Sequence, residues 1–208
     1  MQPGEWLEKF HVKQGEAARQ KINAFLAALK KKNSVINLYS RKTSDQGLET
    51  LLTESGLLCD LLSCNRLIDV GSGNGLLGIP IAVWRPSARV VLVECVAKKA
   101  RALEEFKDSL LLPNVEVFHG TLFDFISARK KEKHWLVARG FPALEDLMAV
   151  VAKKSALGLT AITAAEKCLF LLKKLDCLQQ KVYNIAWREN LVIAEIKHVS
   201  RGTGKNKE

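Results

Sequence analysis

The sequence predicts a doubly wound α/β domain with a mostly parallel sheet, an N-terminal helical extension and a closing antiparallel hairpin. Short apolar runs alternate with helix-like runs from residue 66 onward, which is typical of parallel strands with helices on both faces of the sheet. A turn rich in glycine, within the stretch RLIDVGSGNGLLG of residues 66–78, joins the first of these strands to a helix. Before this stretch, apolar residues recur at helical spacing instead.

The N-terminal extension is expected to cover residues 1–62 and to pack on the domain core. Apolar residues recur every three or four positions between Gly4 and Lys32, which indicates one or two amphipathic helices ending in a basic run. We interpret the apolar stripe as a packing face and the lysines as partners of the helix dipole, although they could also contact phosphate. Another helix is predicted from Ser44 to about Leu62.

Residues 63–199 are expected to form the α/β domain. Its predicted strands are at 67–70, 89–94, 115–118, 134–138 and 157–163, and its predicted helices are at 76–84, 97–112, 144–154 and 165–177. Residues 182–187 and 191–199 are predicted to form the closing antiparallel pair around the polar turn 188–190. The last residues, 200–208, are small, polar and basic, so we expect a flexible tail.

Basic residues outnumber acidic ones. The 32 Lys and Arg against 22 Asp and Glu give a formal net charge of +10 and an isoelectric point near 9.5. This balance favours polyanions through counterion release, but many basic proteins bind no nucleic acid, so charge alone leaves an RNA or DNA substrate open. The lysines at 30–32, 98–99, 130–131 and 133 and in the tail could contact phosphates, and such contacts position a nucleic acid without specifying its sequence.

The cysteine pattern is typical of a reducing compartment. Cys59, Cys64, Cys95, Cys168 and Cys177 are odd in number and form no C-x-x-C pair, so neither a zinc site nor a disulfide framework is expected. The first residues show no apolar core followed by a cleavage site, and no apolar run approaches the length of a membrane span. We therefore expect a cytoplasmic protein with no metal site and no membrane partner.

The glycine-rich turn fits two classes of cofactor. Gly73, Gly75 and Gly78 formally satisfy G-x-G-x-x-G, the dinucleotide fingerprint. The first glycine of that fingerprint should follow the strand directly, however, and the residue at that position is Gly71. An acid just before the turn, Asp69, favours a cationic ligand that resembles an amino acid. S-adenosylmethionine is such a ligand, since it carries an ammonium group and a sulfonium and has no pyrophosphate.

A second acid supports a nucleoside cofactor. Glu94 ends the next predicted strand, nineteen residues after Gly75, close to the spacing of about twenty at which a ribose-binding carboxylate is expected. Because ligands of such sheets lie outside the carboxyl ends of the strands, Asp69, Glu94 and the residues after Phe118 and Val137 should converge on one pocket. The alternative is an ordinary strand–turn–helix unit with incidental acids.

A longer pattern points to a known family. The phrase DVGSGNGLLGIP, residues 69–80, is followed by Arg85-Pro86, Lys98-Lys99 and Arg139, and residues 37–40 are NLYS. From about Asn37 to Lys197 the chain resembles the glucose-inhibited division protein B family, the bacterial 16S ribosomal RNA guanine-N7 methyltransferases. The resemblance implies a class I methyltransferase-like, Rossmann-type sheet and S-adenosyl-L-methionine as cofactor. It further implies methylation of a guanine in a loop of 16S ribosomal RNA, either as free RNA or in the small ribosomal subunit. We expect the protein to be a monomer.

The resemblance also implies roles for single residues around the cofactor. Gly71 and Leu76 would line its methionine and ribose part, Glu94 would hold the ribose, and Leu122 and Phe123 would flank the adenine. Core packing is the alternative for Leu122 and Phe123.

Arg139 is the expected catalytic residue, beside the methyl group and the incoming base. A surface cation or a structural ion pair is the alternative for this arginine. The full set expected to bind the cofactor is Asp69, Gly71, Gly73, Leu76, Glu94, Leu122, Phe123 and Arg139.

The chain departs from the family pattern at several positions. The family usually has an Arg-His pair and an Asp-Ser pair in the helix before the first strand, where this chain has Thr50-Leu51 and Glu54-Ser55. It tends to have Leu-Lys-Gly after the fifth strand, where this chain has Thr163-Ala164-Ala165, and proline is usual at Leu77. The cofactor half of the pattern is therefore more complete than the substrate half.

The chemistry at guanine N7 asks little of the protein. N7 presents a lone pair and carries no proton, so the reaction needs alignment at roughly 3 Å and exclusion of water rather than a general base. This agrees with the lack of a recognisable catalytic His, Cys or Asp-Pro-Pro-Tyr motif. Three alternatives stay open, namely a methyltransferase of a small metabolite, a NAD-dependent oxidoreductase, and a non-catalytic RNA-binding protein of the same fold.

Overall fold

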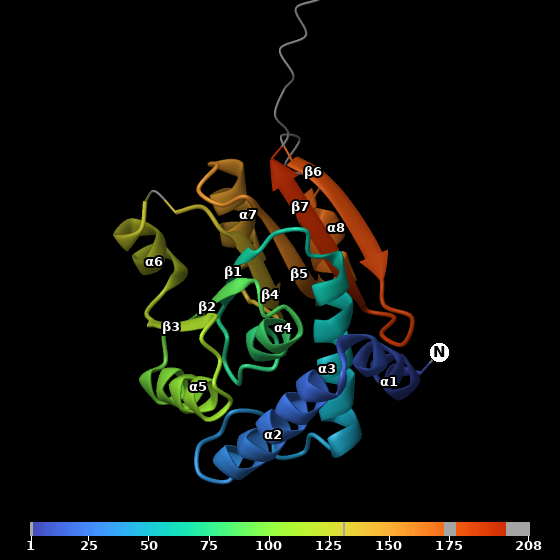
Figure 1. The fold of residues 1–208 in the computed structure, drawn as a ribbon. Helices are drawn as coiled ribbons and strands as arrows, with labels where there is room; N and C mark the ends of the chain where they lie inside the picture. Colours follow the sequence, from blue (N-terminus) through green and yellow to red (C-terminus); the bar gives the residue numbers. More distant parts are fainter. Residues whose placement is uncertain (1, 131, 173–177, 199–208) are drawn as a thin grey trace, which may run out of the picture.

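The computed structural model describes residues 2–130, 132–172 and 178–198, and these form a seven-stranded sheet flanked by helices (Figure 1). The strands are β1 (Arg66–Val70), β2 (Arg89–Glu94), β3 (Val115–His119), β4 (Trp135–Arg139), β5 (Gly158–Ala164), β6 (Leu178–Asn184) and β7 (Leu191–His198). Their order in the sheet is β3-β2-β1-β4-β5-β7-β6. The first five strands are parallel, whereas β7 is antiparallel to both β5 and β6. The predicted doubly wound sheet and its closing hairpin are thus confirmed.

The order of the strands reverses beside β1. The chain runs outward from β1 through β2 to β3, and then returns to β4 on the other side of β1. Asp69 of β1 lies opposite Leu92 of β2 and Val137 of β4. In sheets of this kind a ligand binds outside the carboxyl ends of the strands at the point of reversal. The ends of β1 and β4 therefore mark the expected site.

Helices cover both faces of the sheet (Figure 1). One face carries α1 (Pro3–Gln14), α2 (Glu16–Asn33), α3 (Asp45–Leu61), α4 (Gly78–Trp84) and α5 (Ala97–Ser109), and the other carries α6 (Leu122–Ala128), α7 (Leu144–Ala152) and α8 (Ala165–Leu172). Strand side chains alternate between the two cores, with Leu67 and Leu92 in the first and Ile68 and Val93 in the second. Asp69 follows Leu67 by two positions and so shares its face, toward α4.

The N-terminal extension consists of three helices. The stretch in which one or two helices were predicted contains two, α1 and α2, which are separated at Gly15. The predicted start of α3 is confirmed, because Ser44 Oγ accepts a hydrogen bond from the Gly47 N–H at 3.1 Å. Buried residues of all three helices, among them Phe10, Phe25 and Leu52, join the same core as Leu67 of β1. The extension is thus part of the face on which Asp69 lies.

The structure corrects three sequence-based expectations. Helix α6 was not predicted, although Thr121 and Asp124 form a capping box at its start. Strand β6 lies at Leu178–Asn184 instead of 182–187, since the Arg188 N–H donates to the Ile185 carbonyl at 2.9 Å and turns the chain there. Helix α4 begins at Gly78 rather than at residue 76, because the glycine turn continues further than expected.

Some predictions fall outside the described residues. These are the end of the last helix at 173–177, which includes Cys177, and the tail at 200–208. Within the part of the chain that the structure describes, no helix has the length and apolar character needed to cross a bilayer.

Candidate active site

The glycine-rich turn leaves β1 directly. Gly71 and Gly73 adopt φ values of 68° and 57°, in the left-handed region that residues with a side chain rarely occupy. The N–H groups of Gly71 and Ser72 both donate to the Val93 carbonyl of β2, at 2.9 and 3.0 Å, and tie the turn to that strand. A Cβ at Gly73 would meet only the Gly71 carbonyl, at 3.7 Å, so no side chain crowds the backbone at Gly73. A ligand can therefore approach the main chain here.

Asp69 lies at the end of β1 with only 1% of its surface exposed. Its Oδ2 accepts a hydrogen bond from the Gly78 N–H, the first residue of α4, at 3.0 Å. Burial raises the pKa of Asp69 to about 6, although the charge of Arg139 and the Gly78 N–H act against this shift. The carboxylate is therefore costly to ionise in the ligand-free protein, and a cationic ligand group would stabilise its charged form.

Gly78 sets the distance between α4 and β1, and replacing it should lower stability. A Cβ at this position would lie 2.3 Å from Leu92 Cδ2 and 2.7 Å from Asp69 Oδ2. Because Leu92 is fully buried and cannot move aside, we expect Gly78→Ala to lower the free energy of unfolding by about 1–3 kcal/mol. Gly4→Ala in α1 is the matched control, since its Cβ would make only an ordinary contact of 3.7 Å with Glu49. Thermal unfolding of both variants measures the difference, and equal melting temperatures would contradict the close packing at Gly78.

Glu94 stabilises the turn from β2. Its Oε2 accepts from the Gly73 N–H and its Oε1 from the Val96 N–H, both at 2.8 Å, and the side chain is 5% exposed. These bonds connect the glycine turn to the start of α5. Each carboxylate oxygen still has a second lone pair that could accept from a ligand hydroxyl. The ribose-binding role is thus compatible with these bonds and stays a prediction.

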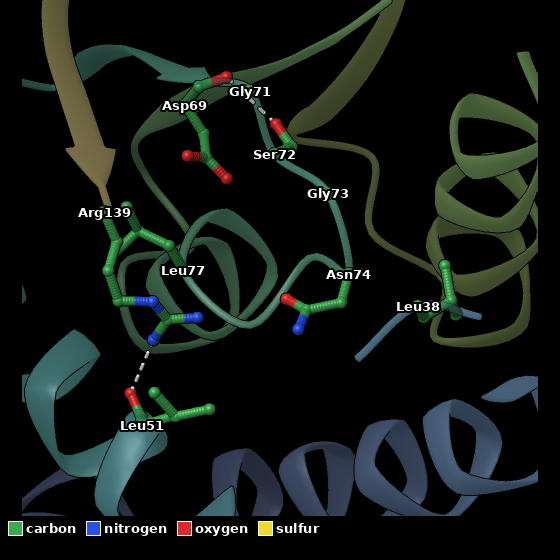
Figure 2. A pocket seen from close by; sticks show the side chains of 9 residues that line it. All are labelled: Leu38, Leu51, Asp69, Gly71, Ser72, Gly73, Asn74, Leu77 and Arg139. Atoms are coloured by element: carbon green, nitrogen blue, oxygen red, sulfur yellow. Dashed lines mark hydrogen bonds between the residues drawn. The ribbon is translucent and has the colours of Figure 1, made fainter. Parts of the chain in front are cut away.

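Arg139 ends β4 and reaches across the site to the N-terminal extension. Its Nη1 donates to the Leu51 carbonyl of α3 at 2.9 Å (Figure 2). It also donates to Ser55 Oγ, on the same helix, at 3.3 Å. Burial lowers the pKa of Arg139, whereas the negative charges of Glu54 and Asp69 raise it. Arg139 is therefore neither a free surface cation nor, among the described residues, a member of an ion pair.

Two neighbouring cavities share Gly71. The first has a volume of about 280 Å³ and is lined by Leu38, Leu51, Asp69, Gly71, Ser72, Gly73, Asn74, Leu77 and Arg139 (Figure 2). The second has a volume of about 210 Å³ and is lined by Val70, Gly71, Val93, Cys95, Gly120, Thr121, Leu122, Phe123, Phe141, Asp146 and Leu147. The first holds an acid and an arginine, and the second is mostly apolar. This arrangement suits a ligand with a charged end and a flat apolar end.

The chain matches one known protein family over most of its length. The family model described as "GidB: rRNA small subunit methyltransferase G" matches residues 18–184. The chain belongs to this family.

Curated relatives of this chain are named "Ribosomal RNA small subunit methyltransferase G". The protein of Hydrogenovibrio crunogenus is 33% identical over 149 residues, which cover 68% of this chain and 64% of the relative. That of Yersinia enterocolitica is 32% identical over 130 residues, 62% of each chain. The match thus spans slightly less than two thirds of the length of these relatives.

Solved structures confirm the class of fold. "Cofactor-bound Rv0187 from MTB" superposes with a TM-score of 0.61 at 17% identity, over 86% of this chain and 89% of the other. A precorrin-6y C5,15-methyltransferase from Geobacter metallireducens superposes with a TM-score of 0.54 at 11% identity, over 76% and 92%. The sheet of this family member is therefore of the class I methyltransferase type.

The residues predicted for the site fall into three groups. Asp69, Gly71, Gly73 and Arg139 line the first cavity, and Gly71, Leu122 and Phe123 line the second. Leu122 also packs in the core with 4% exposure, whereas Phe123 is 54% exposed. Glu94 lines neither cavity but holds Gly73.

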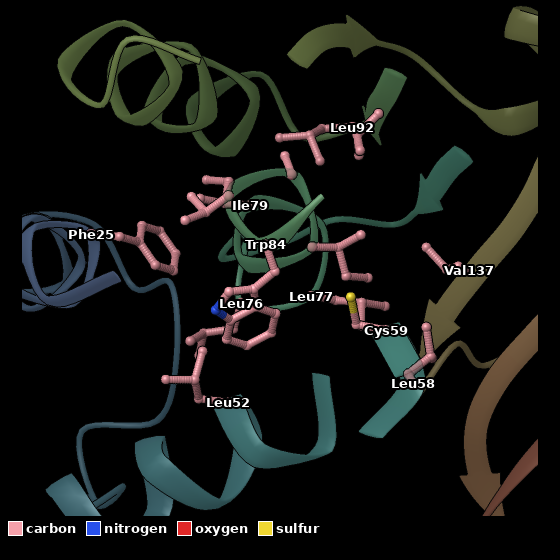
Figure 3. Packing of buried hydrophobic residues seen from close by; sticks show 14 of the residues in the cluster. Phe25, Leu52, Leu58, Cys59, Leu76, Leu77, Ile79, Trp84, Leu92 and Val137 are labelled. Carbon is pink, nitrogen blue, oxygen red and sulfur yellow. The ribbon is translucent and has the colours of Figure 1, made fainter. Parts of the chain in front are cut away.

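Leu76 was predicted to line the cofactor site, but its side chain does not face either cavity. Its side chain is fully buried, in the cluster of Leu52 and Trp84 that Figure 3 shows, instead of at a cavity wall. Its carbonyl accepts a hydrogen bond from Ser55 Oγ at 2.6 Å. Leu76 thus connects the turn to α3, and its role toward a cofactor stays a prediction.

Several lining residues were not predicted. Leu51 and Leu77 line the first cavity. Both stand at positions where this chain departs from the family pattern, and that departure could have indicated a place in the site. Cys95, Phe141 and Asp146 line the second cavity, and no local motif distinguishes them. Their proximity depends on how β2 and α7 pack around β1.

Proposed function

We propose that this chain is an S-adenosylmethionine-dependent methyltransferase that modifies N7 of a guanine in a loop of 16S ribosomal RNA. The observation that supports it most is that Asp69 and Arg139 line one cavity, and that this cavity shares Gly71 with an apolar slot. Residues 63–199 would form the catalytic domain and residues 1–62 its helical extension. The protein would act as a monomer in the cytoplasm, on 16S ribosomal RNA or the small ribosomal subunit.

The described residues fit the cofactor. Asp69 would bind the ammonium group in the first cavity, and the uncrowded backbone at Gly73 leaves room for the methionine part. Leu122 and Phe123 would flank the adenine in the second cavity. Glu94, which accepts the Gly73 N–H, would hold the ribose. Bound S-adenosylmethionine would supply the methyl group.

Arg139 is the residue we assign to the substrate. Only Nη1 of its guanidinium is used in the described hydrogen bonds, so Nε and Nη2 remain as donors toward the cavity. The O6 atom of guanine and backbone phosphates are acceptors that such donors recognise. Leu38, Leu51 and Leu77 would exclude water from the reacting atoms.

No proton has to be removed from guanine N7, so the site needs no general base. The described lining of the first cavity contains neither His nor Cys. This favours N7 over an amino or carbon target, which more often requires a group that handles a proton or a covalent intermediate.

A basic loop beside the first cavity would contact the RNA. Residues 37–42 line an open hollow of about 640 Å³, and Leu38 belongs to both this hollow and the first cavity. Arg41 and Lys42 in this loop are exposed. In contrast, Lys30 and Lys32 pair with Asp45 and Glu105, as expected of lysines with a structural role. An unpaired RNA loop would fit, because its bases can be turned toward a pocket.

The test is mass mapping of 7-methylguanine in 16S ribosomal RNA from cells with and without this gene. We expect one methyl group to be lost without the gene and restored when purified protein and S-adenosylmethionine are added to the subunits. Unchanged RNA together with cofactor binding would point to a small-metabolite substrate. Unchanged RNA without cofactor binding would leave the oxidoreductase or the non-catalytic alternative.

A further inference from the structure

A buried carboxylate beside the site has no part in the chemistry described above. Glu54 of α3 is 1% exposed, and neither of its carboxyl oxygens has a hydrogen-bond partner among the described residues. Its Oε1 lies 3.3 Å from Nε of Arg188, in the connection between β6 and β7. Burial raises the pKa of Glu54, and the charges of Arg139 and Arg188 act against this. Burying a carboxylate without hydrogen bonds costs free energy, so an interaction of its charge with neighbouring groups is expected to offset that cost.

Arg139 is attracted by two acids and yet makes an ion pair with neither in the described structure. Its described hydrogen bonds all go to α3, to the Leu51 carbonyl and Ser55 Oγ. Figure 2 shows the guanidinium directed toward Leu51, with the Asp69 carboxylate on the other side. The charges of both Glu54 and Asp69 favour the protonated arginine. The guanidinium is therefore held on the α3 side against the attraction of Asp69.

We propose that Glu54 is a positioning residue, whose negative charge holds the Arg139 guanidinium on the α3 side and so leaves the Asp69 carboxylate free for the cationic group of the cofactor. This inference rests on the function proposed above. Without the charge of Glu54, Asp69 is the acid that remains to attract Arg139, and a guanidinium paired with Asp69 would compete with the ligand ammonium. Arg188 forms an ion pair with the Glu54 carboxylate.

The first test measures the affinity for S-adenosylhomocysteine by calorimetry with the full chain. We expect Glu54→Gln, which keeps the shape and removes the charge, to weaken binding roughly tenfold. Glu54→Asp keeps the charge and should restore most of the affinity. Glu49→Gln is the matched control, because Glu49 lies on the same helix but is exposed, and it should bind like the wild type. Thermal unfolding of each variant is measured first, and affinities are compared at a temperature at which all variants are folded.

A double-mutant cycle separates positioning from a structural effect. If Glu54 acts through Arg139, then Glu54→Gln should change the affinity less than about twofold once Arg139 has been replaced by alanine. Equal losses in both backgrounds would show that Glu54 does not act through the arginine, and would overturn the proposal.

The second test does not depend on the cofactor. The charged groups that affect Asp69 are Arg139 of β4 and Glu94 of β2, and the Gly78 N–H of α4 bonds to it. In Glu54→Gln the arginine should approach Asp69 and lower its pKa by roughly one unit, which an NMR titration of the Asp69 carboxyl carbon would detect. The shift should vanish in the Arg139→Ala background. An unchanged Asp69 titration would overturn the role of Glu54 whether or not the protein methylates RNA, whereas a shifted titration without cofactor binding would count only against the proposed function.

Discussion

Replacement of Arg139 by alanine is expected to lower methyl transfer to 16S ribosomal RNA by roughly 10²–10³-fold, as does the loss of other preorganised donors in active sites. The guanidinium is fixed by two hydrogen bonds to α3 and needs no reorganisation when a base arrives. Arg139→Lys should restore little, because a single ammonium cannot hold the Leu51 carbonyl and also present a planar set of donors to the base. Initial rates with small subunits and S-adenosylmethionine measure both variants.

The control for this prediction is Arg66→Ala. Arg66 is an exposed arginine at the opposite end of the sheet, at the start of β1, and its loss should leave the rate within about twofold. The affinity for S-adenosylhomocysteine is measured in parallel, since Arg139 also faces the cofactor cavity. If Arg139→Ala left both cofactor affinity and methylation intact, the arginine would have no role in the site.

The second large effect is expected at Asp69, through the pH dependence of cofactor binding. With the Asp69 pKa at about 6, the ionised form that would bind an ammonium group is lost progressively as the pH falls below that value. Affinity for S-adenosylhomocysteine should therefore drop about tenfold per pH unit below pH 6 and be flat near pH 8. Asp69→Asn should bind weakly at every pH and show no such slope. Calorimetric titrations between pH 5 and 8 test this, and a slope that survived in Asp69→Asn would assign it to another group.

The Asp69 carboxylate should also make the free energy of unfolding depend on pH, but in the opposite direction: the protein loses stability as the pH rises, whereas it gains affinity for the ligand. Its pKa of about 6 in the folded protein lies above its ordinary value of 3.8, so the folded state binds a proton that the unfolded chain releases. The stabilisation is complete below pH 4 and is lost as the pH rises to about 6, by on the order of 3 kcal/mol. This contribution disappears in Asp69→Asn. Denaturant unfolding of the ligand-free protein and of the variant, across this pH range, would show the difference.

Much of the sheet could be predicted because its signals are local. The runs at 89–94 and 115–118 are apolar and short, and a helix-like run separates them, so β2 and β3 were expected close to their observed positions. The ends of β6 were predicted poorly. Ile185 and Trp187 continue an apolar alternation, but the chain turns at Ile185, whose side chain is buried in the core beside the N-terminal helices. Packing against a distant segment outweighed the local pattern there.

The contact between Arg139 and α3 shows a second limit of local patterns. The chain lacks the family histidine at position 51, which made the substrate half of the site look incomplete. In the structure it is the main-chain carbonyl of Leu51 that binds Arg139, so this contact does not depend on the side chain. A backbone interaction of this kind leaves no trace in the residue types.

The sequence by itself determined the glycine turn after β1, the acids Asp69 and Glu94 at two neighbouring strand ends, and an arginine at the end of β4. These follow from short-range rules, since a turn, a strand and its terminal residue are specified within a few positions. The tertiary structure alone decided that Leu51, Ser55 and Glu54 complete the surroundings of Arg139, and that the Leu76 side chain faces the core. The physical reason is that Leu51 and Ser55 precede Arg139 by 88 and 84 residues, and only the burial of the N-terminal helices on the sheet brings their polar groups within hydrogen-bond distance.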